Sequence, residues 1–249
     1  MARRKSLQSI PAISTNLSVV NNKLKIKLED LTEITPLTSN QQKFFQLYDQ
    51  SNFIMLHGVA GTGKTYIALY KSLEEVLTKG NQYYRVILVR SAVPSRDIGY
   101  LPGDEHEKTI VYEKPYVEIC EDLFNKKDAY QKLTEQHFLY FMNTSYIRGI
   151  TLDNSIIIVD ECQNMTDMEL NSIITRVGKN SKIIFCGDFR QTDLYKKYDQ
   201  SGLKKFMLIT DLMPSSKIVE FEHEDIVRSE LVKQYIVARS VYEDMYETK

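Results

Sequence analysis

Cysteine and histidine are scarce in this sequence, which limits the kinds of site it can build. The three cysteines in 249 residues are too few and too scattered for a disulfide framework or a zinc site, and the four histidines form no metal-like cluster. No apolar run approaches the roughly 18 residues that a transmembrane helix needs. The basic start, MARRKSLQSI, is not followed by the apolar segment of a secretory signal. These absences predict a cytoplasmic protein with no membrane partner.

A large excess of charge is also absent. The formal net charge is −1, whereas a protein that binds nucleic acid through its overall charge is usually basic. Any contact with nucleic acid must therefore come from local basic patches, and we expect most of the candidate patches to be solvated surface. They are Arg3-Arg4-Lys5, Lys126-Lys127, Lys196-Lys197 and Lys204-Lys205. With 43% hydrophobic and 26% charged residues, the composition is that of an ordinary globular protein with material for one or two domains.

The order of apolar segments predicts an α/β fold. From about Leu37, five short apolar runs bounded by turn-forming residues alternate with helical stretches. Runs of this kind suit parallel strands that are buried on both faces. They are NFIMLHG (52–58), RVILVRS (85–91), SIIIVDE (155–161), KIIFCGD (182–188) and KIVEF (217–221). Strands that alternate with helices predict a parallel sheet with helices on both faces.

We expect two parts along the chain. Residues 1–35 form an N-terminal extension, in which KLKIKL (23–28) alternates polar and apolar residues and predicts one half-exposed strand. Residues 36–249 form a single domain. The tyrosine-rich stretch 104–150 interrupts the alternation of strands and helices in this domain, and we expect it to be a helical insertion.

Three helices are predicted from apolar spacing and capping residues. One follows Thr65. A second begins with a capping box formed by Thr166 and Glu169, and ends near Gly178. The third lies near the C-terminus and carries apolar residues at the spacing of one helix face. They are Leu231, Tyr235, Ala238 and Tyr242.

The segment HGVAGTGKT (57–65) fits the pattern G-x-x-x-x-G-K-[ST] of a phosphate-binding loop, between a predicted strand and a predicted helix. Glycines let the backbone wrap around a phosphate, and the exposed amides at a helix N-terminus favour its negative charge. We expect Lys64 to reach the β- and γ-phosphates of a nucleotide, and the Thr65 hydroxyl to bind Mg²⁺. The predicted nucleotide-binding residues of the loop are Gly58, Val59, Ala60, Gly61, Thr62, Gly63, Lys64 and Thr65.

The segment IIIVDECQN (156–164) is unusual because a buried-looking strand runs directly into two acids. One interpretation is a strand that emerges into solvent, where acids are common at the next helix start. The phosphate loop favours a second interpretation, since ligands collect where a neighbouring strand ends beside such a loop. On that interpretation Asp160 holds Mg²⁺, directly or through water, and Glu161 orients the water that attacks the γ-phosphate.

Two glutamines and four tyrosines are weaker candidates. Gln191, in CGDFRQTDL (186–194), either bonds the γ-phosphate or the attacking water, or belongs to a simple polar loop. Gln41, upstream of the phosphate loop, either reads an adenine edge or lies on the surface at a helix start. The four tyrosines either stack on bases or pack the fold. They are Tyr112, Tyr116, Tyr140 and Tyr146.

The sequence resembles the PhoH-like family, whose fold is similar to a single RecA-like domain of superfamily 1 helicases. The matching segments run in the family's order and spacing from Gln41 to Arg228. Of these, YIRGITL is the most distinctive, because generic P-loop proteins lack it. Besides the phosphate loop, the segments are ILVRSAVPSRDIGYLPGD (87–104), KPY (114–116), YIRGITL (146–152), IIIVDECQN (156–164), GDFRQTDL (187–194) and DIVRSELV (225–232).

The resemblance implies ATP hydrolysis with Mg²⁺, helicase-like work on RNA or single-stranded DNA, and ring-shaped homo-oligomers such as hexamers. Arg148 and Arg228 match arginines of the family. Because the chain has room for only one such domain, we expect a neighbouring subunit to supply Arg228, or alternatively Arg148, in trans to the γ-phosphate. Arginines in this role are worth about 10³–10⁵ in rate. The chain departs from the family at Cys162 and Ser229, where alanine and histidine are usual.

The sequence therefore predicts a Mg-dependent ATPase that acts on or with RNA or single-stranded DNA. One alternative is a small-molecule kinase, which also uses a phosphate loop. The acids and the glutamine behind them argue against a kinase, because they suit water better than an acceptor hydroxyl. The other alternative is a non-enzymatic, nucleotide-dependent assembly factor, which substitution of Glu161 would distinguish from an ATPase.

Overall fold

A six-stranded parallel sheet forms the centre of the structure. The computed structural model describes residues 25–91, 105–188 and 202–246. The strand order is β3-β2-β4-β5-β1-β6, and all five pairings are parallel. The strands are β1 (Phe53–Gly58), β2 (Arg85–Arg90), β3 (Leu139–Asn143), β4 (Ser155–Asp160), β5 (Lys182–Gly187) and β6 (Ser216–Phe221). The predicted α/β fold with a parallel sheet is confirmed.

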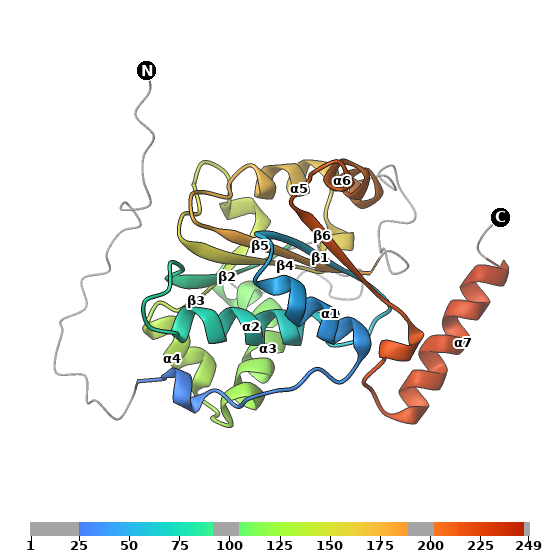
Figure 1. Ribbon diagram of the computed structural model, residues 1–249, viewed down its shortest axis with the longest axis horizontal. Coiled ribbons are helices and arrows are strands. Elements are labelled where there is room, and N and C mark those ends of the chain that lie inside the picture. Colours follow the sequence, from blue (N-terminus) through green and yellow to red (C-terminus); the bar gives the residue numbers. More distant parts are fainter. Residues whose placement is uncertain (1–24, 92–104, 189–201, 247–249) are drawn as a thin grey trace, which may run out of the picture.

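Helices cover both faces of this sheet. The first four helices, α1 to α4, lie on one face, α5 and α6 lie on the other, and α7 extends away from the body (Figure 1). The helices are α1 (Ser39–Tyr48), α2 (Lys64–Leu77), α3 (Glu105–Phe124), α4 (Ala129–Glu135), α5 (Asp167–Ile174), α6 (Gly202–Asp211) and α7 (Glu230–Tyr246). Short 3-10 helices are η3 (Leu28–Asp30), η4 (Thr144–Tyr146), η5 (Cys162–Asn164) and η6 (His223–Asp225). Within the described ranges, no helix has the length and apolar character needed to cross a bilayer.

The central strands are apolar throughout because both of their faces are buried. Successive side chains of a strand point to opposite faces of its sheet. In β4, Ile156 and Ile158 belong to the core under α1 to α4, whereas Ile157 and Val159 belong to the core under α5 and α6. Every residue of β4 is buried. This two-sided burial explains why the sequence shows continuous apolar runs instead of alternation.

The stretch 104–150, expected to be a helical insertion, contains a strand as well as helices. Helices α3 and α4 fill most of it, and β3 then pairs with β2 at one edge of the sheet. β3 has the sequence LYFMN, and only its first residue is fully buried. Residues 138–142 form a continuous apolar run like those of the other strands, but periodicity alone does not separate a short buried strand from a segment of a helix.

The strand expected over 23–28 is wrong for the part that the structure describes. Residues 25–27 have no regular structure, and Leu28–Asp30 form η3. Part of the expected N-terminal extension also lies against the domain. Ile26 is 3% exposed in the core under α1 to α4, and the Thr32 amide donates to the Leu123 carbonyl of α3 at 2.8 Å. The alternation of KLKIKL thus reflects one buried isoleucine on an irregular segment.

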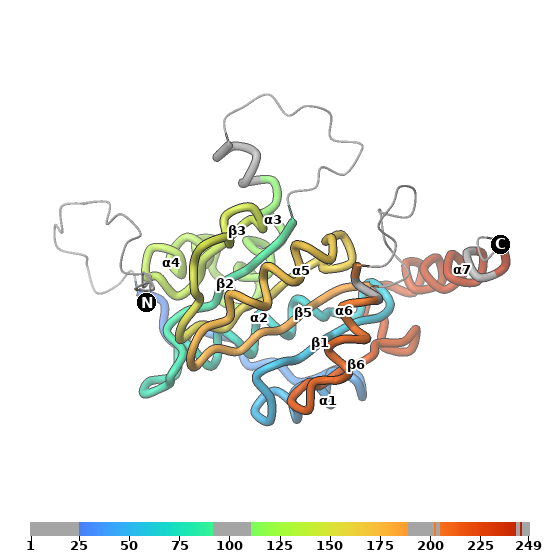
Figure 2. Tube along the Cα trace, turned by 90° about the horizontal axis from the view of Figure 1, so that it is seen from above, coloured from blue at the N-terminus to red at the C-terminus, as the bar shows by residue number. Residues whose placement is uncertain are grey.

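The C-terminal helix forms as predicted, but its apolar stripe does not face the core. Leu231, Tyr235 and Tyr242 are 77%, 64% and 57% exposed, and Met245 continues the same exposed stripe. This face therefore does not pack inside the domain. Helical spacing of apolar residues predicts a helix with one apolar side, but it does not say which surface covers that side. Figure 2 shows α7 extending from the body of the domain.

The sheet brings three chain segments together at the carboxyl ends of its strands. The carboxyl ends of parallel strands lie on the same side, so the segments after β1, β4 and β5 meet there. β4 is the second neighbour of β1, because β5 lies between them. β5 ends at Gly187, where a Cβ would lie only 2.5 Å from Cys162 Sγ and 2.9 Å from Gln163 Oε1. A glycine at this point lets the segment after β4 cross close to the end of β5.

Candidate nucleotide-binding site

The phosphate loop connects β1 to α2 through backbone bends that its glycines permit. Gly58, Gly61 and Gly63 have φ angles of +119°, +77° and +81°, a region that residues with side chains seldom adopt. Position 58 also has no room for a side chain, because a Cβ there would lie 2.0 Å from the carbonyl oxygen of Phe221 on β6. Gly63 precedes α2 without any side-chain cap. The first amides of the helix are thus available to an anion.

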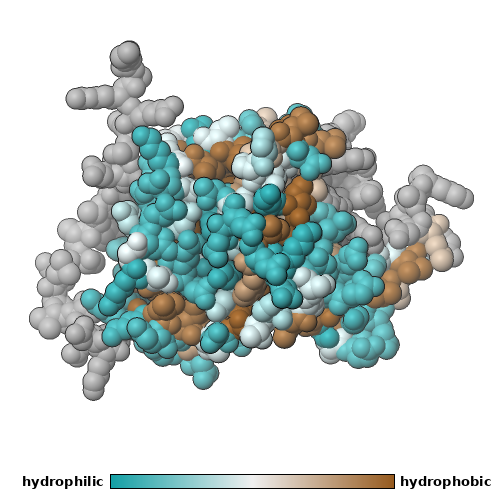
Figure 3. Space-filling view, viewed as in Figure 1, coloured by the Kyte–Doolittle hydropathy of each residue, from teal (hydrophilic) through white to brown (hydrophobic). Residues whose placement is uncertain are grey.

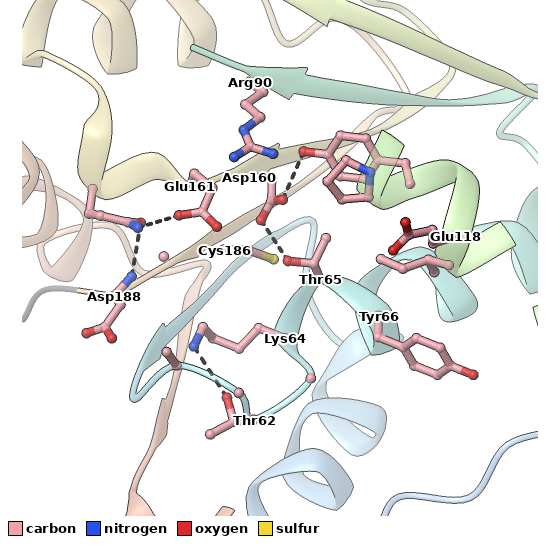
Figure 4. A pocket seen from close by; sticks show the side chains of 18 of the residues that line it. Thr62, Lys64, Thr65, Tyr66, Arg90, Glu118, Asp160, Glu161, Cys186 and Asp188 are labelled. Atoms are coloured by element: carbon pink, nitrogen blue, oxygen red, sulfur yellow. Dashed lines mark hydrogen bonds between the residues drawn. The ribbon is translucent and has the colours of Figure 1, made fainter. Parts of the chain in front are cut away.

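A cavity of about 540 Å³ lies over this loop, a volume typical of a small-ligand site. Residues 60–65 line it, whereas Gly58 and Val59 do not belong to its lining. The other walls come from β2, α3, the segments after β4 and β5, and the segment before α7 (Figure 4). Charged and polar residues on these walls include Arg90, Tyr116, Glu118, Asp122, Asp160, Glu161, Gln163, Asp188 and Arg228.

The Lys64 ammonium lies on the carbonyls of its own loop. Lys64 Nζ donates to the carbonyl oxygens of Gly58 and Val59 at 2.9 and 2.8 Å, and to Thr62 Oγ1 at 3.3 Å. Burial lowers the pKa of Lys64, and nearby acids, Asp188 foremost, oppose that change. The loop thus holds one cation at its centre, within reach of any phosphate that the loop amides bind.

Asp160 joins two helices through its two carboxylate oxygens. Thr65 Oγ1 on α2 donates to Oδ1 at 2.7 Å, and the Tyr116 hydroxyl on α3 donates to Oδ2 at 2.9 Å. Burial, followed by the charge of Asp160, raises the pKa of Tyr116 well above its usual value, so the hydroxyl remains a donor. Because Asp160 is only 7% exposed, the interpretation that the strand emerges into solvent is wrong.

Glu161 follows Asp160 in a left-handed backbone conformation, with φ +52° and ψ +40°. Such a conformation costs a non-glycine residue about 1–3 kcal/mol and is concentrated at functional sites. The side chain is held by Gln163, whose Nε2 donates to Glu161 Oε2 at 2.5 Å and whose Oε1 accepts from the Asp188 amide at 3.1 Å. Burial, and then the neighbouring Asp160, raise the pKa of Glu161. A fixed carboxylate with a raised pKa is suited to accept a proton.

The structure brings one of the two predicted arginines to this pocket. A Cβ on Gly61 would lie 3.0 Å from Arg228 Cγ, and the Val227 amide donates to the Gly61 carbonyl at 3.0 Å. Arg228 therefore lines the pocket of its own chain, and no neighbouring subunit is needed to bring it there. Arg148 is exposed and does not line the pocket; its guanidinium lies 3.9 Å from Met168 Sδ.

Gln41 on α1 is hydrogen-bonded to the phosphate loop. Its Nε2 donates to the Thr62 carbonyl at 3.0 Å, and its Oε1 accepts from the Leu37 amide at 2.8 Å. The residue is 3% exposed, so the alternative of a surface glutamine is wrong. A role in reading adenine stays a prediction. Gln191 lies outside the described residues.

The four tyrosines proposed for base stacking differ in their surroundings. Tyr116 is fully buried and bonded to Asp160, so it packs the fold. Tyr140 stacks on the ring of His137, with centroids 6.0 Å apart. Tyr112 is half-buried, whereas Tyr146 is 53% exposed. Tyr146 is therefore the member of this group with the most surface to offer a partner.

The residues at the foot of the pocket fit a magnesium ion. Mg²⁺ prefers oxygen ligands and is usually held by one or two carboxylates together with substrate phosphates and water. The Thr65 hydroxyl and the Asp160 carboxylate present such oxygens side by side, 2.7 Å apart, in the wall of the pocket. In the described part of the chain, no three or more His, Cys, Asp or Glu side chains are grouped so as to enclose a metal. Most ligands of an ion at this point would therefore come from phosphate oxygens and water.

Similarity to known proteins agrees with this geometry. A family model described as PhoH-like protein matches residues 33–240. The chain belongs to the PhoH-like family. It is 32% identical to the PhoH-like protein of Mycobacterium leprae (strain TN) over 222 residues, which cover 89% of this chain and 62% of that protein. It is 33% identical to the PhoH-like protein of Bacillus subtilis (strain 168) over 202 residues, which cover 81% of this chain and 62% of that protein.

This PhoH-like chain spans about three fifths of the length of these relatives. Among solved structures, the large terminase from a thermophilic bacteriophage is similar with a TM-score of 0.47 and 13% identity, over 85% of this chain and 51% of the terminase chain. The family match confirms the resemblance inferred from the motifs, and the phosphate loop between β1 and α2 lies on an α/β fold of the P-loop type.

Arg90 of the PhoH-like pocket was not predicted as a site residue, and Tyr116 was predicted only as a tyrosine that stacks on bases or packs the fold. Arg90 is the last residue of β2, and Tyr116 lies in the middle of α3. A signal for Arg90 is present in the sequence, because RVILVR ends an apolar run with a charge just as SIIIVD does. Tyr116 belongs to KPY (114–116), a segment of the family resemblance, but that segment does not say which group the tyrosine hydroxyl bonds.

Proposed function

We propose that this PhoH-like chain hydrolyses ATP with the help of Mg²⁺. One observation carries the proposal: the Thr65–Asp160 pair and the Gln163-held Glu161 line the same cavity as the phosphate loop and Lys64. These groups suit the two tasks of phosphate binding and water activation. A cavity with only the phosphate loop would suit binding alone.

The roles follow from the chemistry of each group. The loop amides and Lys64 bind the phosphates, and Thr65 and Asp160 hold Mg²⁺, which neutralises charge on the phosphate oxygens when bound. Water adds to the γ-phosphorus while the bond from that phosphorus to the β–γ bridging oxygen breaks, which gives ADP and inorganic phosphate. Glu161 accepts the proton that the water loses, and Gln163 keeps the Glu161 carboxylate in place.

Two substitutions test this proposal. Glu161→Gln keeps the shape of the side chain but removes the base, so phosphate release should fall by about 10²–10⁴-fold while binding of a fluorescent ATP analogue persists. Lys64→Ala should lose both binding and turnover. Unchanged hydrolysis in Glu161→Gln would refute the assignment of the base. Nucleotide binding without hydrolysis in the wild-type protein would instead favour the assembly factor.

We further propose that RNA or single-stranded DNA is the partner of this ATPase. The family resemblance motivates this proposal, and exposed Tyr146 and Arg148 offer a ring and a cation of the kind that bind single strands. Phosphate release should rise when single-stranded RNA or DNA is added, and Tyr146→Ala should weaken that stimulation without changing the basal rate. Equal rates with and without both polymers would count against a nucleic-acid partner.

We also propose a ring-shaped homo-oligomer, with hexamers as the expected size. The exposed apolar stripe of α7 supports assembly, because monomeric proteins seldom expose contiguous apolar surface of this kind. Figure 3 shows apolar side chains at the α7 end of the molecule, beyond the mainly hydrophilic face. A second copy is the occupant we expect on this stripe.

A cytoplasmic location is proposed as well. Cys120, Cys162 and Cys186 are all buried free thiols, which is the state that a reducing compartment maintains. Fractionation of cells that produce the protein tests this location.

A further inference from the structure

Arg90 occupies the same position on its strand as Asp160 does on the next strand. β2 and β4 are paired in register with Arg90 opposite Asp160, so the carboxyl ends of both strands carry a charged residue side by side. The Arg90 side chain is half-buried and lines the nucleotide pocket. In Figure 4 its guanidinium points from β2 toward Asp160 and Glu161, with Lys64 on the other side of the two acids. The acids thus lie between two cations.

The charges that line the pocket favour a contact between Arg90 and phosphate. Five carboxylates line the pocket, whereas its cations are Lys64, Arg90 and Arg228. A triphosphate would add further negative charge, so each cation at the γ-phosphate end counts. A guanidinium also presents a rigid fork of five N–H donors, which matches phosphate as well as carboxylate oxygens.

Helix α3 fixes the position of Arg90. Tyr112 and Tyr116 are four residues apart, so they lie on one face of the helix. The Arg90 Cζ atom lies 6.0 Å from the centre of the Tyr112 ring, within the range of a cation–π contact. Tyr116 interacts with Arg90 and also donates to Asp160 Oδ2 at 2.9 Å. One helix therefore holds both the arginine and the acid that is expected to bind Mg²⁺.

Resting on the ATPase activity proposed above, we propose that Arg90 contacts the γ-phosphate in cis, and that Tyr116 is the residue of α3 that positions it together with Asp160. An arginine in this role stabilises the charge that develops on the phosphoryl oxygens in the transition state. Its loss therefore reduces turnover more than it reduces ground-state binding. If Arg90 only neutralised Asp160 and Glu161, the protein without Arg90 would still bind a transition-state mimic more tightly than ADP.

The test compares Arg90→Ala and Arg90→Lys with Arg85→Ala, which removes the arginine at the other end of β2. Arg85 bonds Ser155 and lies against Tyr140, away from the pocket. Phosphate release, and the affinities for Mg-bound mant-ADP and for ADP–fluoroaluminate, are measured for each variant. Wild-type protein should bind ADP–fluoroaluminate at least about 10²-fold more tightly than ADP, as expected for a transition-state mimic.

Arg90→Ala should lower kcat by about 10³-fold and abolish this preference for ADP–fluoroaluminate, with mant-ADP affinity within about twofold of wild type. Arg90→Lys should also lose at least about tenfold in kcat, because an ammonium cannot make the bidentate contact. If Arg90→Ala fails to fold, the result for Arg90→Lys decides the test. Arg85→Ala should behave as wild type. A retained kcat, or a retained preference for ADP–fluoroaluminate, in Arg90→Ala would overturn the role of Arg90.

Failure of the ATPase proposal is distinguishable from failure of this one. Wild-type protein that binds nucleotide without hydrolysis would end the ATPase proposal, and the ADP–fluoroaluminate preference would still decide whether Arg90 contacts the transferred group. Wild-type protein that binds no nucleotide would overturn both.

Tyr116→Phe and Tyr130→Phe form a matched pair for the positioning role. Each removes a tyrosine hydroxyl that donates to a carboxylate at 2.9 Å, but Tyr130 bonds Glu113, away from the pocket lining. Tyr116→Phe should lower kcat by about tenfold and raise the Mg²⁺ concentration for half-maximal mant-ATP binding, whereas binding in excess EDTA stays unchanged. Tyr130→Phe should change none of these. Equal behaviour of the two variants would refute the role of Tyr116.

Discussion

Thr65 and Asp160 are 95 residues apart in the sequence, yet the hydroxyl of one donates to the carboxylate of the other at 2.7 Å. The contact links the first turn of α2 to the last residue of β4 across the end of β5. It unites the two motifs that made the sequence informative. Their meeting point is also where an oxygen-preferring ion would bind.

Asp160→Asn should weaken the use of Mg²⁺ while it leaves the phosphate loop intact. The amide has nearly the same size but no charge, so the Mg²⁺ concentration for half-maximal mant-ATP binding should rise by about 10–100-fold. Binding in excess EDTA should change little, and it serves as the internal control. An unchanged Mg²⁺ requirement would remove Asp160 from the proposed metal site.

Gly187→Ala should destabilise the protein and disturb Glu161. The new Cβ would meet Cys162 Sγ at 2.5 Å and Gln163 Oε1 at 2.9 Å. Overpacking of this kind costs about 1–3 kcal/mol, and a displaced Gln163 would no longer hold the Glu161 carboxylate. Urea unfolding and phosphate release measure the two effects.

A second substitution tests the source of the clash. Cys162→Ala removes the sulfur, so it should recover part of the stability that Gly187→Ala loses, and a double-mutant cycle measures this coupling. Additive effects of the two substitutions would show that Cys162 and residue 187 do not compete for the same space.

The pH dependence of turnover should reflect the raised pKa of Glu161. Only the carboxylate form accepts a proton, so activity is present above the pKa of Glu161 and falls as the pH drops through it. Since burial and Asp160 raise this pKa, the acid limb of kcat/KM should lie above the usual glutamate value of about 4.3. The measurement is kcat/KM for Mg-ATP from pH 8 downward to about pH 4, with mant-ATP binding as the control. Full activity maintained to the usual glutamate pKa would contradict this assignment.

The exposed stripe of α7 should control assembly. Tyr235→Ser combined with Tyr242→Ser removes two exposed rings, and serine and tyrosine have similar helix propensities, so α7 should persist. Light scattering after size exclusion should show an oligomer for the wild type and a smaller species for the double variant. Gln234→Ser, at an exposed polar position of the same helix, is the control. A wild-type protein that is monomeric at every concentration would exclude assembly through this stripe.

The fold was predictable where burial leaves a strong pattern. β4 is buried on both faces and reads as a continuous apolar run, and the capping box predicted for Thr166 and Glu169 is present at the start of α5. β3 escaped prediction because its apolar run lies in a stretch expected to be helical, and periodicity alone does not separate a short strand from a segment of a helix. The exposed face of α7 escaped it for a related reason, since apolar spacing does not say what covers an apolar face.

The site was predictable where the chemistry is local in sequence. The phosphate loop and the Asp160–Glu161 pair are each contiguous, so their residue types and spacing point to phosphate and to a hard cation. Arg90 and Tyr116 belong to the same pocket only because β2 pairs with β4 and α3 packs beside them. Such contacts depend on the tertiary fold: the sequence RVILVR shows that Arg90 ends an apolar run, but no local pattern shows that it lies opposite Asp160.

The attachment of α7 has a mechanical consequence. Its preceding segment is bonded to the phosphate loop through the Val227 amide and the Gly61 carbonyl, and Ile236 of the helix approaches Gly61 as well. A helix of 17 residues is a stiff rod of about 25 Å, so a tilt of about 5° at its base moves its far end by about 2 Å. An adjustment of the loop around a phosphate that tilted the helix would therefore move Met245, on the stripe that faces outward. A movement at the nucleotide site would thus be transmitted to the exposed stripe of α7.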